Sequence, residues 1–269
     1  MSRKSFTTPD GCQLVYEVEG EGPVVLWQHG LGASFDQPRA VFPEVAVTRL
    51  SLACRGHEDS DLGPLEDLSI ATFSKDVLAL LDHLGIDRLA AAGGISLGAA
   101  ISLRLAAYYP ERVERLILAR PAWVDRPALE NQQGYIAVGQ QLELFGAQGL
   151  ESFQSTELYQ DIKKLSPDNA NSLLSYFSRP RLETTTALLA RLPKDWPGVP
   201  LSMLTVLTQP TLLIGNGEDW VHPLSFAHKL AEFIPHARLE VIPSKSVDSA
   251  GYTAKFRLAL EQFLQEVLM

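Results

Sequence analysis

Short apolar runs alternate along the chain with longer stretches in which apolar residues recur every three or four positions. The short runs are typical of buried strands, and the longer stretches are typical of amphipathic helices. Clear examples are the strand at 24–27 and the helix at 69–84, which Ser69 is expected to cap and Gly85 to end. Because alternating strands and helices build parallel sheets covered on both faces, the pattern predicts an α/β fold with a mostly parallel central sheet. The other expected strands span 6–8, 14–18, 48–52, 89–92, 115–119, 211–215 and 238–242, and the other expected helices span 96–109, 225–233 and 253–267.

The alternation is interrupted between Trp123 and Thr208, where the pattern contains helices and no convincing strand. A helical insertion late in a parallel sheet would lie over the carboxyl ends of the strands, where open α/β sheets bind ligands. The sequence therefore predicts a helical cap of residues 123–208, inserted into a core formed by 1–122 and 209–269. The helical patterns in the expected cap span 135–144, 169–177 and 182–192.

Composition and charge narrow the function classes. The 269 residues carry a net charge of -9, which argues against a nucleic-acid partner, because phosphate binding needs a basic surface. The two cysteines, Cys12 and Cys54, fit a reducing compartment rather than a disulfide framework. No signal peptide and no membrane-spanning apolar run is evident, so we expect a cytoplasmic protein. No metal-ligand spacing and no phosphate-cradling loop appears, so the expected partner is a small molecule, with no cofactor and no metal; the oligomeric state stays open.

One motif carries candidate chemistry. The stretch Gly94-x-Ser96-x-Gly98 follows an expected strand and opens an expected helix. A tight strand-to-helix turn needs small neighbours, and it points the serine hydroxyl outward at the positive end of a helix. The string alone also fits a glycine-rich β-to-α turn, and it is the position between strand and helix that favours a nucleophile.

The wider context of Ser96 resembles the α/β-hydrolase family across essentially the whole chain. After a strand, His29-Gly30-Leu31-Gly32 looks like the oxyanion loop of that family. The stretch 215–223 looks like the loop that carries the acid, with Asp219 as the matching residue. The resemblance implies the α/β-hydrolase fold, with Ser96 as nucleophile and Asp219 as acid.

The resemblance also implies an oxyanion hole made of the backbone amides of Leu31 and Leu97. Each such donor typically contributes about 3–4 kcal/mol of transition-state stabilisation. Beside this hole, we expect a substrate site with contributions from His29, Gly30, Trp123 and Trp220. The tryptophans also fit ordinary core or cap packing.

The resemblance fails where the general base belongs. After the last strand the family reads Pro-x-x-Gly-His, whereas this chain reads Pro243-Ser244-Lys245-Ser246-Val247, and no histidine follows His236. A second departure lies in the Asp-x-Arg-Gly-His-Gly-x-Ser pattern, where Ala53 replaces the aspartate and Glu58 replaces the glycine. Loss of the base from a serine triad costs on the order of a millionfold in rate in one protease.

Several groups are candidates to replace that base. We favour His222, which lies three residues after Asp219 at the same edge of the sheet, although it also fits a loop histidine that caps the next helix. His29 and His57 also fit structural roles under the oxyanion loop. Lys245 would need burial to lower its pKa, and Asp219 would need direct contact with Ser96. Asp248 would need burial to act as a base.

Three functions remain open from the sequence. The first is hydrolysis of a small carboxylic ester, thioester or related acyl compound through Ser96, Asp219 and an unusual base. The second is a non-hydrolytic lyase or isomerase reaction in which the oxyanion hole stabilises an enolate. The third is a non-catalytic protein that binds a small ligand under the cap.

Overall fold

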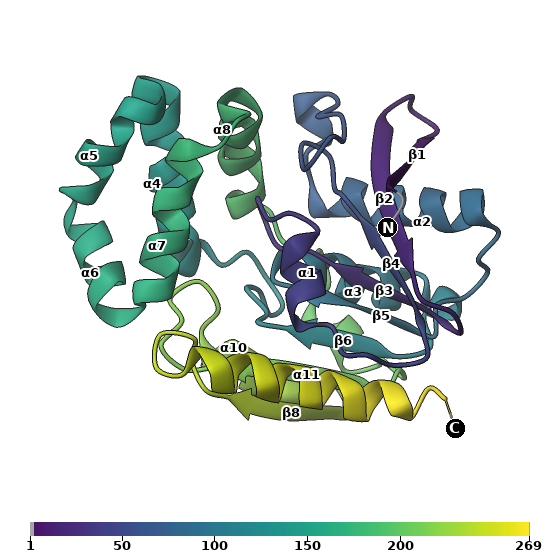
Figure 1. Cartoon of the computed structure of the whole chain (residues 1–269). Helices are drawn as coiled ribbons and strands as arrows, with labels where there is room; N and C mark the ends of the chain where they lie inside the picture. Colours follow the sequence, from purple (N-terminus) through teal and green to yellow (C-terminus); the bar gives the residue numbers. More distant parts are fainter. Residues whose placement is uncertain (1–2, 269) are drawn as a thin grey trace.

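The structure is a computed structural model that describes residues 3–268, and these residues build one eight-stranded sheet (Figure 1). The strand order is β1-β2-β4-β3-β5-β6-β7-β8. β2 pairs antiparallel with β1 and β4, and the neighbouring pairs from β4 to β8 are parallel. This topology confirms the predicted mostly parallel α/β sheet. The strands are β1 Arg3–Thr7, β2 Gln13–Glu19, β3 Val24–Gln28, β4 Thr48–Leu52, β5 Ala91–Ile95, β6 Leu116–Ala119, β7 Thr211–Asn216 and β8 Ala237–Ile242.

Helices cover both faces of the sheet because successive strand residues point to opposite sides. Leu26 belongs to an apolar cluster shared with α2, α3 and α10, whereas Val25 and Trp27 belong to a second cluster shared with α1 and α11. None of the described helices combines the length and hydropathy needed to span a membrane. The helices are α1 Asp36–Val41, α2 Ile70–Leu84, α3 Leu97–Tyr108, α4 Leu129–Phe145, α5 Gly149–Gln154, α6 Glu157–Leu165, α7 Pro167–Ser175, α8 Leu182–Arg191, α9 Leu201–Leu204, α10 Leu224–Phe233 and α11 Ser249–Gln265.

The ends of α2 follow from local chemistry, as the sequence predicts. The Oγ of Ser69 accepts a hydrogen bond from the amide of Thr72 at 3.1 Å, which satisfies one of the free amides at the start of the helix. Gly85 ends the helix in the left-handed region, with φ +66°. These two residues confirm the predicted cap and stop.

All regular elements between β6 and β7 in the described chain are helical, and Figure 1 shows α4–α8 gathered on one side of the molecule. The helical stretches predicted at 135–144, 169–177 and 182–192 overlap α4, α7 and α8, and the segment also contains α5, α6 and α9. The insertion has its own apolar cluster, which includes Phe153, Ile162 and Leu173, and Leu31 of the core packs against it. The division into a core and a cap at 123–208 stays a prediction.

A close approach of α3 to β3 sets the turn at Ser96. A Cβ on Gly98 would lie 2.5 Å from the carbonyl oxygen of Gln28, and a Cβ on Gly94 would lie 2.7 Å from the same oxygen. No side chain fits at either position without moving the backbone of β3. The helix therefore starts directly against the sheet, and this places Ser96 at the carboxyl end of β5.

We predict that Gly98→Ala lowers the free energy of unfolding by about 2–4 kcal/mol, because the added methyl group meets backbone atoms that cannot rotate away. Gly217→Ala is the matched control, since a Cβ there meets nothing within 4 Å. Urea unfolding of both variants measures the difference. Equal stability of the two variants would contradict the close packing described for α3.

Candidate active site

Ser96 occupies a strained turn between β5 and α3. Its φ is +57° and its ψ is -108°, a conformation that residues other than glycine rarely adopt. Its amide donates to the carbonyl of Ala119 at 2.9 Å, which ties the turn to β6. The residue is buried, with 8% of its surface exposed, and it lines a cavity. The turn thus holds the hydroxyl at the sheet edge in a pocket largely shielded from water.

His222 contacts both Ser96 and Asp219. Its Nε2 lies 2.8 Å from the Oγ of Ser96, and its Nδ1 lies 2.9 Å from Oδ1 of Asp219. An ionised carboxylate only accepts hydrogen bonds, so Nδ1 carries the proton and donates to Asp219. Nε2 is then the acceptor for the hydroxyl of Ser96. Three residues from two loops therefore form a serine–histidine–carboxylate arrangement.

The loop that carries both Asp219 and His222 is fixed by the helical insertion. Asn131 of α4 donates through Nδ2 to the carbonyl of Val221 at 2.5 Å. The amide of Val221 donates to Oδ1 of Asn169, in α7, at 2.8 Å. Both amide side chains are buried. The insertion thus binds both the N–H and the C=O of Val221, the residue before His222.

Arg120 binds the far side of the Asp219 carboxylate. Its Nε and Nη2 lie 2.8 Å and 2.6 Å from Oδ2, and the side chains of Arg120 and Asp219 are 15% and 1% exposed. Arg120 directly follows β6 and has a φ of +49°. β6 and β7 are parallel neighbours, with Ala119 opposite Ile214, so the residues after both strands meet at the same edge. Asp219 therefore balances its charge with Arg120 and orients His222 with its other oxygen.

These contacts set the protonation of the pair. Burial pushes the pKa of Asp219 upward, but the charges of Arg120 and His222 and their hydrogen bonds outweigh it and hold that pKa well below its usual value. For His222, burial lowers the pKa, Asp219 raises it and Arg120 lowers it again, with a net lowering. At neutral pH the carboxylate is ionised and the imidazole is neutral, which is the state a general base requires.

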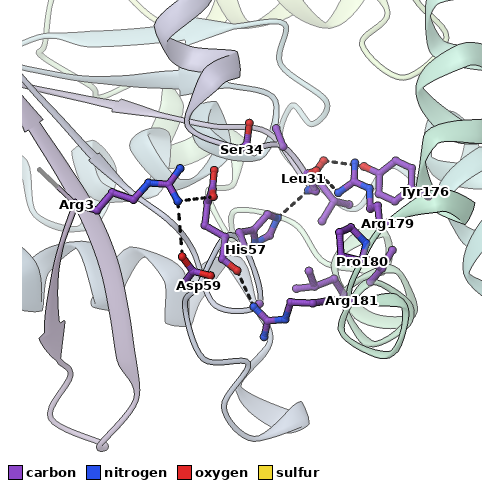
Figure 2. Close-up of a pocket in the computed structure, with 15 residues that line it drawn as sticks. Arg3, Leu31, Ser34, His57, Asp59, Tyr176, Arg179, Pro180 and Arg181 are labelled. Carbon is purple, nitrogen blue, oxygen red and sulfur yellow. Dashed lines mark hydrogen bonds and ion pairs between the residues drawn. The ribbon is translucent and has the colours of Figure 1, made fainter. Parts of the chain in front are cut away.

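The loop around Leu31, which the sequence predicts to be the oxyanion loop, is held by side chains of the insertion and of the core. Tyr176 donates its hydroxyl to the carbonyl of Leu31 at 2.7 Å, and the Arg179 guanidinium donates to the carbonyl of Gly32 (Figure 2). The amide of Gly32 donates to Nε2 of His57 at 2.7 Å. Among the described residues, the amides of Leu31 and Leu97 donate to no protein acceptor. An oxyanion hole formed by these two amides stays a prediction.

His29 and His57 serve the framework beneath this loop. Nε2 of His29 accepts from the amide of Cys54 at 3.1 Å, and Nε2 of His57 accepts from Gly32. Burial lowers the pKa of His29 to about 4 and that of His57 well below its usual value. With their acceptor nitrogens already occupied, neither ring is available to Ser96.

The loop after β8 brings no base to Ser96. The side chain of Val247 is exposed, at 70%, and Asp248 accepts from the amide of Gly251 as the cap of α11. Ser244 donates to Glu218 at 2.9 Å, which ties this loop to the one that carries His222. Lys245 lines the cavity at Ser96 without a hydrogen bond to Ser96. Of the alternative bases weighed from the sequence, His222 is the group that contacts Ser96.

Glu58 replaces the glycine of the family pattern at a left-handed position, with φ +48°. Its Oε1 accepts from the amide of Phe35 at 2.9 Å, and its Oε2 pairs with Arg3 at 3.3 Å. These contacts compensate the strain of a side chain at a position that suits glycine. The replacement thus leaves the loop at His57 intact.

A cavity of about 490 Å³ opens over Ser96. Of the residues predicted to bind substrate, Gly30 lines it and His29 lies buried below the loop. Trp123 is packed in the core, and Trp220 lines a different pocket of about 750 Å³. The geometry therefore gives no support to substrate contacts from His29, Trp123 or Trp220, and these stay predictions.

In the described chain no cluster of histidine, cysteine and carboxylate side chains is arranged to hold a metal ion.

Sequence reasoning missed Arg120, Tyr176 and Arg179. For Arg120 a signal was present, because a charged residue directly after a fully apolar strand at the ligand-binding edge needs a partner. Tyr176 and Arg179 lie in the insertion, where no local pattern distinguishes a side chain that reaches the core from one that faces solvent.

A profile of the α/β hydrolase fold family matches residues 23–245, so this chain belongs to that family. It is 26% identical to 3-oxoadipate enol-lactonase 2 of Acinetobacter baylyi, with 97% of each chain covered. It is 30% identical to the dihydrolipoyllysine-residue acetyltransferase component of the acetoin cleaving system of Pseudomonas putida, over 94% of this chain and 65% of that one. The fold is similar to the crystal structure of MGS-M2, an α/β hydrolase enzyme from a Medee basin deep-sea metagenome library, with a TM-score of 0.75, 21% identity and 97% of each chain covered. These comparisons establish the predicted α/β-hydrolase fold.

We predict that Arg120→Met lowers the free energy of unfolding by about 3 kcal/mol, because it leaves the buried charge of Asp219 with one partner fewer. The control is Arg238→Met, which breaks an exposed ion pair with Glu266 and is expected to cost less than about 1 kcal/mol. Urea unfolding at neutral pH compares the two. A smaller loss for Arg120→Met than for Arg238→Met would refute the importance assigned to the Arg120–Asp219 pair.

Proposed function

We propose that this chain hydrolyses a small carboxylic ester, thioester or related acyl compound. In this proposal Ser96 is the nucleophile, His222 the general base and Asp219 the acid that orients it. The observation that carries the proposal is the 2.8 Å contact between Nε2 of His222 and Oγ of Ser96, with Asp219 on the other ring nitrogen. A serine hydroxyl becomes a useful nucleophile when such a base takes its proton.

The reaction follows from these contacts. Oγ of Ser96 attacks the acyl carbon while Nε2 of His222 takes the hydroxyl proton, and the carbonyl oxygen becomes an oxyanion facing the amides of Leu31 and Leu97. The intermediate collapses, the bond to the leaving group breaks, and His222 returns the proton to that group. Water then attacks the acyl-enzyme with His222 as base. Release of the acid restores Ser96.

Asp219 and Arg120 have separate tasks in this scheme. The Asp219 carboxylate fixes the tautomer of His222 and stabilises the imidazolium that forms during attack. Arg120 balances the carboxylate and disfavours the imidazolium in the resting site. At neutral pH the resting imidazole is therefore neutral, with its proton on Nδ1 and none on Nε2, and it gains its charge only when the serine proton arrives.

The relatives support an acyl substrate without defining it. The name 3-oxoadipate enol-lactonase describes cleavage of a cyclic ester, and another relative, 2-hydroxymuconate semialdehyde hydrolase of Pseudomonas, is also a hydrolase, 28% identical over 82% of this chain. The lyase, isomerase and binding-protein alternatives drew their support from the missing base. The position of His222 weakens that support.

We also propose that residues 123–208 act as a cap over Ser96. Asp168, Asn169 and Arg179 of this segment line the cavity, and Asn131 and Asn169 hold the loop of His222. Closure of the insertion would exclude bulk water and order the base in the same step.

The central prediction concerns covalent labelling of Ser96 by a fluorophosphonate. Ser96→Ala abolishes the labelling, and His222→Ala slows it by about a thousandfold or more, because the serine then has no base. The control is His228→Ala, which removes an exposed histidine of α10 and is expected to label at the unmodified rate. Mass spectrometry of the labelled protein measures each rate.

A histidine returned to position 247 provides the opposite test. The Val247 side chain faces solvent and His222 already contacts Ser96, so Val247→His is expected to give no gain in esterase rate. A large gain, together with normal labelling of His222→Ala, would overturn the role proposed for His222.

The pH dependence gives an independent prediction. Hydrolysis of a nitrophenyl acetate ester rises with pH as His222 loses its proton, and the midpoint in kcat/KM lies below the usual histidine pKa because the folded protein lowers it. Arg120→Gln removes a positive neighbour that disfavours the imidazolium, so the midpoint moves to higher pH. An unchanged midpoint, or a shift to lower pH, would argue against Arg120 acting on the base.

A further inference from the structure

The cavity over Ser96 is lined mostly by polar side chains. Its apolar side chains are those of Leu31, Ala33 and Ile95, near the oxyanion loop and the turn at Ser96. The rest of the lining is mostly amide, hydroxyl and charged groups. Pockets that bind apolar compounds are mostly hydrophobic with a few polar groups, so this lining favours a polar substrate. The polar and charged lining residues, apart from Ser96 and His222, are Gln37, Arg120, Tyr135, Asp168, Asn169, Asn171, Ser172, Arg179 and Lys245.

The charges around the cavity have the opposite sign to the chain as a whole. Arg120, Arg179 and Lys245 supply three cations, against the two carboxylates of Asp168 and of Asp219 below the cavity. One positive charge is therefore in excess at this site, in a chain with a net charge of -9. The cations come from three separate segments, which the fold brings to one place.

Arg120 makes this excess possible. In a site without it, the ionised Asp219 beneath His222 would repel a second anion. Here the carboxylate is balanced by the guanidinium at 2.6 Å, so Arg179 and Lys245 act on the cavity without that opposing charge. Among the described residues, neither Arg179 nor Lys245 has a carboxylate within ion-pair distance.

The neighbouring pocket in Figure 2 shows the contrast. It lies on the other side of Leu31 and Gly32, with a volume of about 520 Å³, and it also contains arginines. There Arg3 is paired with Glu17, Glu58 and Asp59. The Arg181 guanidinium donates to the carbonyl of Glu58 at 2.7 Å. Arg179 lines both pockets and donates to the carbonyl of Gly32. Arg3 and Arg181 are thus already engaged, whereas Lys245 makes no ion pair or side-chain hydrogen bond among the described residues.

The backbone on both sides of Lys245 is tied to the loop of Asp219. Ser244 and Ser246 on either side of it both donate to Oε2 of Glu218, at 2.9 Å and 3.2 Å. Glu218 precedes Asp219 in the chain, so the loop with the lysine is fastened to the loop with the acid and base. The backbone of Lys245 is thus held beside the cavity, which its exposed side chain helps to line.

We propose that the substrate is a small polar acyl compound that carries a carboxylate, and that Lys245 and Arg179 bind this carboxylate while the ester or thioester carbonyl lies at Ser96. This inference rests on the hydrolase function proposed above and adds the substrate class. Arg179 also holds the Gly32 carbonyl, so its contact with the carboxylate connects substrate binding to the oxyanion loop. The cavity volume of about 490 Å³ suits a compound of metabolite size.

The test compares two esters that differ in one charge. Monomethyl glutarate is an anion, and dimethyl glutarate is its neutral counterpart, with hydrolysis of both followed by acid titration at constant pH. The expected result is a kcat/KM per ester bond about tenfold higher for the anion, because opposite charges strengthen binding and encounter. Lys245→Ala lowers this ratio toward one, and Lys245→Glu inverts it. The control Lys255→Ala, at an exposed position of α11, leaves the ratio unchanged.

Failure of the carboxylate site and failure of the hydrolase function give different results in this test. Equal cleavage of both esters, with a ratio insensitive to Lys245→Glu, overturns the carboxylate site and leaves the hydrolase function standing. Failure to cleave either ester, with no labelling of Ser96, contradicts the hydrolase function. In that case calorimetry decides the carboxylate site: binding of glutarate but not of glutaramide, lost in Lys245→Ala, supports it, and absence of glutarate binding overturns it.

Discussion

The carboxylate of Asp219 is the contact on which the site depends. It receives the Nδ1–H and the amide of His222 on one oxygen and the Arg120 guanidinium on the other. A buried carboxylate is costly unless its lone pairs are satisfied, and this one has donors from the ends of two adjacent strands. The parallel pairing of β6 with β7 is what brings those donors together. The pairing of β6 with β7 therefore determines both the Arg120–Asp219 ion pair and the orientation of His222.

Side chains of the helical insertion hold two loops of the core at the site. Asn131 and Asn169 fix the peptide groups beside His222, and Tyr176 and Arg179 fix the carbonyls of the oxyanion loop. Two loops of the core thus take their positions from side chains of the insertion. The order of the site therefore depends on the contacts between the insertion and the core.

The sequence predicts the regular parts of this protein well because they follow from local rules. The strand–helix alternation, the cap at Ser69, the stop at Gly85 and the sheet class are confirmed. His222 was favoured as the replacement base because three residues of separation at a sheet edge suffice for contact with Asp219. The role of Arg120 needs the register of β6 against β7, and the polar lining of the cavity needs the packing of the insertion. Neither the role of Arg120 nor the polar lining can be predicted from a short stretch of sequence.

The proposed acid and base share one short loop, residues 219–222, instead of lying after two different strands. Among the residues proposed to move or orient the proton, the last in the chain is His222. β8 and α11 follow it, contribute none of these residues, and mainly stabilise the sheet. The two side chains are therefore close because they are close in the chain, while their orientation still depends on Arg120, Asn131 and Asn169. For natural variation, exposed positions after β8 such as Val247 are free to change, whereas Ser244 and Ser246 tie their loop to Glu218, beside the proposed acid.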